Sequence, residues 1–157
     1  MSNPFPFVAG ATLTAAELNQ IGEAVSFTPD WQTGVTVGNA TQTAHYYELN
    51  DMIFLQVDFS LGSTSAITGD VRMGLPINSA GTFPQGANLT GFAYDASTAN
   101  YWRVMGTAFD GSAVRVRYIR QSGAAAAAVF ASALSSTAPF TWSTSDRLVF
   151  ATSYKRG

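Results

Sequence analysis

The sequence predicts a mainly β protein: an antiparallel β-sandwich or jelly-roll-like domain, preceded by an extended N-terminal arm and one short α-helix. Three observations support this prediction. From Asp30 onward apolar and polar residues alternate, short strands recur about every 10–12 residues, and turn dipeptides such as Asp110-Gly111 separate them. We place the arm and helix in residues 1–28 and the β-domain in residues 29–157, because a chain of 157 residues can bury one core.

The first ten residues predict an extended arm. Two prolines in the segment SNPFPFVAG block helix formation and keep the residues before them extended. The arm also carries Phe5, Phe7 and Val8, which would form an apolar surface if they were left in water. We therefore expect the arm to dock, either on its own domain or on another protein.

A short helix is predicted to follow the arm. Thr14 and Glu17 fit a capping box, in which each side chain accepts a hydrogen bond from the backbone N–H of the other residue. Leu13 and Leu18 flank this box. Leu18, Ile21 and Val25 then follow at helical spacing and form one apolar stripe. Thr28-Pro29 is predicted to end the helix. Its narrow apolar stripe fits an interface between copies, and it equally fits packing against the β-domain.

The remaining chain reads as strands separated by turns. Gly38-Asn39 and Asn50-Asp51 are turn dipeptides between alternating segments. Strands are expected at residues 35–37, 41–49, 52–61, 71–75, 89–95, 101–109, 113–120 and 147–153. The alanine-rich residues 123–134 favour helix by intrinsic propensity. We interpret them as extended or loop structure, because tertiary context in an all-β domain overrides propensity.

Composition excludes several classes of function. Charged residues make up 11% of the chain, the net charge is −2 and no basic tract occurs, so we expect no nucleic-acid partner. The longest apolar run is far too short to span a bilayer, which predicts no membrane insertion. With no Cys and with His45 as the single His, thiolate and zinc sites are disfavoured and no cofactor is expected, although an oxygen-ligated Ca²⁺ or Mg²⁺ stays open.

The chain shows no catalytic motif, and we predict that it is not an enzyme. Neither a nucleophile elbow nor a phosphate-binding loop occurs in the sequence. The candidate binding residues are Arg115 and Arg117 on one strand, with Arg103 and Trp102 on its partner strand. Such guanidinium groups can hold a carboxylate or an acidic glycan, with the tryptophan as a sugar platform. The alternatives are a solvated arginine face and a tryptophan that belongs to the core or to an interface.

Four segments support a resemblance to a known family: LTAAELNQI, WQTGVTVGNATQTAHYYELNDMIFLQVDF, MGLPI and PFTWSTSDRLVFATSYK. In this order they resemble a small family of bacteriophage virion-surface proteins, which comprises head-decoration, minor tail and short tail-fibre proteins. The resemblance implies a terminal β-sandwich on the virion surface. It also implies a homotrimer, with the LTAxxLN helix as the attachment and trimerisation element.

The residues and the resemblance together predict a structural protein. We expect a trimeric capsid decoration protein that is anchored through the N-terminal arm and the helix stripe. Its expected partners are other copies of itself and the major capsid protein or other virion proteins. The alternative is a minor tail or tail-fibre-like adsorption module that binds host surface glycans.

Overall fold

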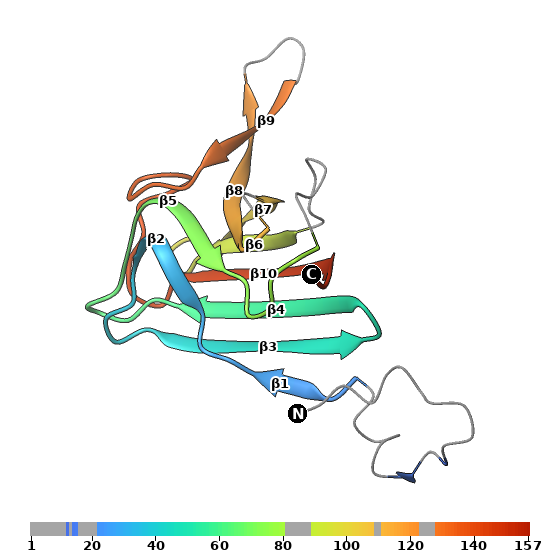
Figure 1. The fold of residues 1–157 in the computed structure, drawn as a ribbon. Coiled ribbons are helices and arrows are strands. Elements are labelled where there is room, and N and C mark those ends of the chain that lie inside the picture. The colour runs from blue at the N-terminus through green and yellow to red at the C-terminus, as the bar shows by residue number, and fades with distance from the viewer. Residues whose placement is uncertain (1–11, 13, 16–21, 81–88, 109–110, 123–127) are drawn as a thin grey trace.

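The protein is mainly β and antiparallel, as the alternating sequence predicts. The computed structural model describes residues 12, 14–15, 22–80, 89–108, 111–122 and 128–157 (Figure 1). The strands are β1 (Ala24–Ser26), β2 (Asp30–Thr36), β3 (Thr41–Leu49), β4 (Met52–Ser60), β5 (Ala66–Gly74), β6 (Thr90–Asp95), β7 (Asn100–Ala108), β8 (Ala113–Ser122), β9 (Ala128–Ala133) and β10 (Arg147–Lys155).

All ten strands belong to one sheet that curls into a half-barrel. The strand order is β1-β3-β4-β10-β6-β7-β8-β5-β2, and β9 pairs with β8 beside this path (Figure 1). The predicted sandwich or jelly roll is not confirmed, because the strands form one continuous hydrogen-bonded sheet. A twisted sheet with one apolar face can enclose a core by coiling, so alternation alone does not distinguish the two architectures.

The core fills the concave side of this sheet. Inward residues of β4 and β10 supply its centre, where Phe59 and Phe150 are fully buried. Trp31 of β2 packs edge-on against both rings, with centroid separations of 5.2 and 6.4 Å. Because β2 lies at one end of the strand order, the Trp31 contacts bring that end of the sheet over its middle.

The two end strands of the path, β1 and β2, are consecutive in the chain. Phe27 follows β1 directly, and its N–H donates to the Ala44 carbonyl at 3.1 Å. Val25, predicted in the helix stripe, instead lies in β1 and pairs with Tyr46 of β3, so the helix prediction is wrong at this residue. The physical reason is Gly22, whose φ of +74° is outside the helical range and suits the residue after a helix end.

The N-terminal arm is not confirmed. Its apolar residues and most of the helix stripe lie outside the described residues: Phe5, Phe7, Val8, Leu13, Leu18 and Ile21. Ala15 has a helical backbone, and Ala24–Ser26 belong to the sheet although they fall in the predicted N-terminal segment. Within the described ranges no helix has the length and apolar character needed to cross a membrane. The boundary at residues 28 and 29 stays a prediction.

Two turns interlock at one end of the sheet. The Asn39 side-chain oxygen accepts hydrogen bonds from the N–H and the hydroxyl of Thr64, both at 2.9 Å, and the Asn39 N–H donates to the same hydroxyl at 3.0 Å. Gly38 has a φ of +51°, and a Cβ there would meet the Thr64 carbonyl oxygen at 2.2 Å. The Gly38-Asn39 dipeptide therefore joins the β2–β3 turn to the β4–β5 turn.

The extended interpretation of the alanine-rich segment is confirmed for β9. Its six residues pair with β8 from Arg117↔Ala133 to Ser122↔Ala128. Residues 123–127 lie outside the described part of the chain. The paired strands β8 and β9 project from the body of the half-barrel (Figure 1).

Candidate functional site

The outward face of the sheet carries side chains in ordered rows. Because successive residues of a strand point to opposite faces, the core-facing residues of β4 and β10 leave alternate positions on the outside. The strand registers align these outward residues into three rows, each read from β3 through β4, β10 and β6 to β7. The rows are Thr41–Ser60–Arg147–Tyr94–Tyr101, Thr43–Asp58–Val149–Phe92–Arg103, and His45–Gln56–Ala151–Thr90–Met105.

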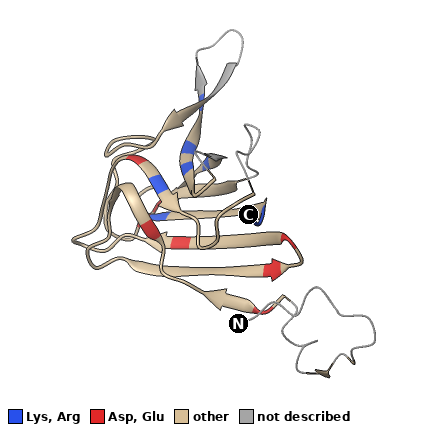
Figure 2. Cartoon of the chain, in the orientation of Figure 1, with Lys and Arg blue, Asp and Glu red and all other residues tan. Residues whose placement is uncertain are grey.

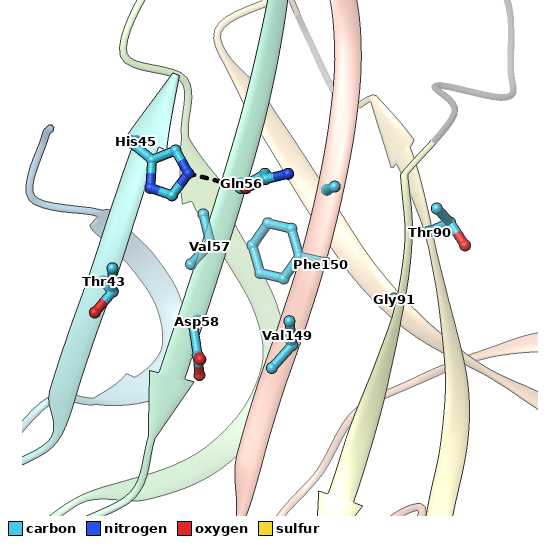
Figure 3. Close-up of a pocket in the computed structure, with 10 residues that line it drawn as sticks. Thr43, His45, Gln56, Val57, Asp58, Thr90, Gly91, Val149 and Phe150 are labelled. Carbon is cyan, nitrogen blue, oxygen red and sulfur yellow. Dashed lines mark hydrogen bonds between the residues drawn. The ribbon is translucent and has the colours of Figure 1, made fainter. Parts of the chain in front are cut away.

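A groove of about 380 Å³ lies across the second and third rows (Figure 3). It forms because its middle positions are small: Val149 and Ala151 of β10 lie between longer side chains of β4 and β6. On one side, the His45 Nε2 and the Gln56 side-chain oxygen are hydrogen-bonded at 2.9 Å. The polar residues that line the groove are Thr43, His45, Gln56, Asp58 and Thr90.

An ion pair lies at the border of this groove. The Arg147 Nε donates to one Asp58 oxygen at 3.3 Å, and the guanidinium Nη2 donates to the other oxygen, so the contact is bidentate. The Asp58 carboxylate raises the pKa of Arg147, first through the hydrogen bond and then through its charge. A second depression, of about 310 Å³, is lined by Thr41, Thr43, Asp58, Ser60 and Arg147. The two depressions share Thr43 and Asp58 as lining residues, so they adjoin, and we call them together the outer groove.

Aromatic rings extend the first row beyond the ion pair. Tyr94 and Tyr101 have ring centroids 4.6 Å apart with planes inclined at 34°, and Phe92 contacts Tyr101 edge-on at 5.3 Å. Tyr101 is 66% exposed. Both tyrosines lie close enough to Arg147 to contribute to its raised pKa. The rings therefore form an exposed aromatic surface beside the outer groove.

The predicted arginine cluster lies farther along the sheet. Figure 2 shows basic residues on β5 and β8 and acidic residues on β3 and β4. Arg115 forms an ion pair with Asp70 of β5, with its Nε 2.9 Å from a carboxylate oxygen. Arg117 pairs in register with Met105 of β7, and Arg103 is outward on the same strand opposite Phe92.

Trp102 and Arg103 both line a further depression of about 490 Å³, which Tyr101 and Arg120 also line. Arg115 and Arg117 do not line it, so the structure does not bring the four predicted contact residues together. Trp102 packs inward against Phe140 at a centroid distance of 4.7 Å. All three tryptophans are partly buried against the core, which agrees with the core alternative.

Acidic residues elsewhere hold loops in place. The Asp95 carboxylate accepts hydrogen bonds from the Ser97 and Thr98 hydroxyls at 2.6 and 2.8 Å, and these bonds lower the pKa of Asp95. The fully buried Asp146 accepts from the N–H groups of Ala96 and Ser143. Across the residues that the structure describes, no group of three or more His, Asp or Glu could hold a metal ion.

Sequence reasoning missed the outer groove. It assigned no binding role to Asp58, Arg147, Tyr94 or Tyr101. The signal that was available is the parity of the outward positions, which places Asp58 and Gln56 on one face of β4. That signal could not identify β10 and β6 as the neighbouring strands.

Comparisons with protein-family models, with curated proteins and with solved structures find no match to this chain.

Proposed function

We propose that this chain is a structural protein of a bacteriophage virion surface: a trimeric capsid decoration protein that is anchored through its N-terminal segment. The sequence segments that resemble virion-surface proteins support the viral part of this proposal. The low content of charged residues supports a surface that lies against other proteins.

One observation supports the assembly role above the others. Large apolar side chains are exposed together at the turn between β3 and β4, where Leu49, Met52 and Phe54 are 49%, 38% and 43% exposed. Leu49 pairs directly with Met52, and Phe54 pairs with Tyr47, so these residues form one patch on the outer face. We call these four residues the apolar patch. Contiguous exposed apolar residues are typical of protein–protein contacts.

The apolar patch lies beside the entry of the N-terminal segment. Ala24, the first residue of β1, pairs with Tyr47. A second copy that docks here would contact the patch and the N-terminal segment together. This geometry supports a trimer contact at the N-terminal end of the domain, with the outer groove left accessible farther along the same face.

Light scattering on the full chain tests the proposal. A trimer has about three times the 16.6 kDa mass of one chain. The double variant Leu49→Ser, Phe54→Ser should shift the mass toward that of a monomer, because it removes the apolar contact. Tyr101→Ser is the matched control, since it removes an exposed aromatic ring outside the patch and should leave the mass unchanged. A wild-type monomer at micromolar concentration would refute the trimer.

Binding to assembled particles tests the anchor. Full-length chain should co-sediment with phage heads that lack their decoration protein, whereas a chain without residues 1–10 should fold and stay in the supernatant. Equal co-sedimentation of both chains would refute anchoring through the arm.

A further inference from the structure

We propose that the outer groove binds an uncharged oligosaccharide. The inference does not depend on the virion assignment, because it is drawn from the groove alone. Its basis is the density of hydrogen-bonding groups in a groove of ligand size, next to an exposed aromatic surface.

The groove offers the groups that sugar hydroxyls require. A carboxylate, a guanidinium, an amide and an imidazole come from Asp58, Arg147, Gln56 and His45. Planar groups with two donors or two acceptors can contact two neighbouring hydroxyls of a sugar ring at once. Threonine and serine hydroxyls along the same groove, at Thr41, Thr43, Ser60 and Thr90, can both donate and accept.

These polar groups are held in place before any ligand binds. Asp58 and Arg147 orient each other through the bidentate contact, and Gln56 is held by His45 at 2.9 Å. Each residue lies on a paired strand of the same sheet. A site on rigid elements loses little conformational entropy on binding, which favours affinity for a flexible chain such as an oligosaccharide.

The tyrosine pair supplies the apolar part of the site. A sugar ring has one face of C–H groups that must leave water when it binds, and a flat exposed ring can cover it. Tyr101 is the most exposed of the large apolar side chains described, and its tilted contact with Tyr94 supports one side of its ring. Its hydroxyl remains available for a further hydrogen bond.

Charge argues for a neutral ligand. Arg147 is the only Lys or Arg among the described residues that line the outer groove itself, and Asp58 pairs with it. Arg103 and Arg120 lie beyond the groove, in the depression that Tyr101 also lines. An anionic ligand in the groove would lie next to that carboxylate and a cationic one next to the guanidinium, so the ion pair favours neither charge. The volumes of the two depressions are in the range of roughly 300–1,000 Å³ that small-molecule sites occupy. Because the two depressions adjoin at Thr43 and Asp58, a ligand of more than one sugar unit can contact both.

The test is an NMR titration of the full chain with defined probes. The neutral probes are tetramers to hexamers of glucose, galactose, mannose and N-acetylglucosamine, and the acidic probe is a heparin hexamer. We expect at least one neutral probe to saturate at millimolar concentration or below. The amide shifts should change around Thr43, Gln56 and Tyr94 and should not change at the apolar patch.

Matched variants locate the site. Tyr101→Ala and Asp58→Asn should each weaken binding at least tenfold, because one removes the platform and the other removes an acceptor. Phe54→Ala is the control for an exposed aromatic residue on the same face. Asp70→Asn is the control for breaking an inter-strand ion pair outside the groove. Both controls should bind as the wild type does, and amide spectra establish that all four variants are folded.

Three outcomes would overturn the proposal. One is the absence of groove shifts with every neutral probe, the second is stronger binding of the heparin hexamer, and the third is an equal loss of affinity in the control variants. None of these results depends on the oligomeric mass. A monomer that binds a neutral probe would refute only the trimer, and a trimer without groove shifts would refute only the sugar site.

Discussion

The contact of Trp31 with the middle of the sheet should control the stability of the half-barrel. Trp31 belongs to β2, and its indole N–H donates to the side-chain oxygen of Gln42 on β3 at 2.7 Å. The ring also contacts Phe59 and Phe150 edge-on. β2 and β3 are not neighbours in the strand order, so these side chains link two separate parts of the sheet across its open side.

We expect Trp31→Ala to lower the free energy of unfolding by about 3 kcal/mol, near the lower end for aromatic truncation because the ring is only partly buried. For a chain of this length, that loss corresponds to a Tm lower by about 6–12 °C. Trp31→Phe keeps an aromatic ring at the contact and loses the indole donor, so it should cost about 1 kcal/mol from the hydrogen bond.

A double-mutant cycle isolates the hydrogen bond. Gln42→Met keeps the length of the side chain and removes the acceptor, and it is combined with Trp31→Phe. Urea unfolding of the four proteins should give a coupling of about 0.5–1.5 kcal/mol between the two positions. A coupling below about 0.3 kcal/mol, within the error of additive sites, would show that Trp31 does not link β2 to β3.

Three further predictions concern single positions. Gly34→Ala should destabilise by about 1–2 kcal/mol, because Gly34 has a φ of +78° and a Cβ would lie 2.5 Å from the Asp70 carbonyl oxygen. Gly69→Ala should be close to neutral, because a Cβ at Gly69 would lie in open space. Urea unfolding measures both variants, and an equal loss of unfolding free energy in Gly34→Ala and Gly69→Ala would contradict the strain argument. Asn39→Ala should cost about 1 kcal/mol by thermal unfolding, since it removes the acceptor that joins the two turns, and an unchanged Tm would exclude that role. Because hydrogen bonds lower the pKa of Asp95 in the folded state, its stabilisation is present above the unfolded pKa near 4 and is lost as the pH falls through the folded value. Asp95→Asn should therefore differ most from the wild type at neutral pH and converge on it in acid, and a constant difference from pH 6 to 2 would contradict this assignment.

The strands were predictable where alternation and turns agree. β3 and β4 match the expected segments within one residue, because their period-two pattern is bounded by Gly38-Asn39 and Asn50-Asp51. Asn50 adopts a φ of +54°, a conformation that asparagine tolerates better than most residues. Local chemistry therefore determines these boundaries.

β1 was not predictable in the same way. Val25 continues the helical spacing of Leu18 and Ile21, and a strand of three residues is too short for a period of two to be detected. Its conformation depends on pairing with β3, which is a tertiary contact. Gly22 was the local signal that could have ended the helix earlier.

The outer groove depends on contacts that sequence patterns do not encode. Its rows exist because β10 lies between β4 and β6, and nothing in the alternation of β10 specifies those neighbours. The sequence shows which residues of each strand share one face of the sheet, but it does not show the order of the strands. Tyr94 and Tyr101 are brought together by the short β6–β7 connection, so their pairing is the part of the site that hairpin reasoning could have found.

The position of β10 has a consequence for how the protein folds. Arg147 contacts Asp58 across 89 residues of sequence, and until β10 is in place both β4 and β6 have an open edge. Such non-local pairing slows folding, and open strand edges can recruit other chains during the delay. The hairpins β3–β4 and β6–β7 can form early and independently, whereas the groove between them forms only when β10 inserts. Folding yield during expression should therefore be most sensitive to substitutions in β10, even where the finished protein tolerates them.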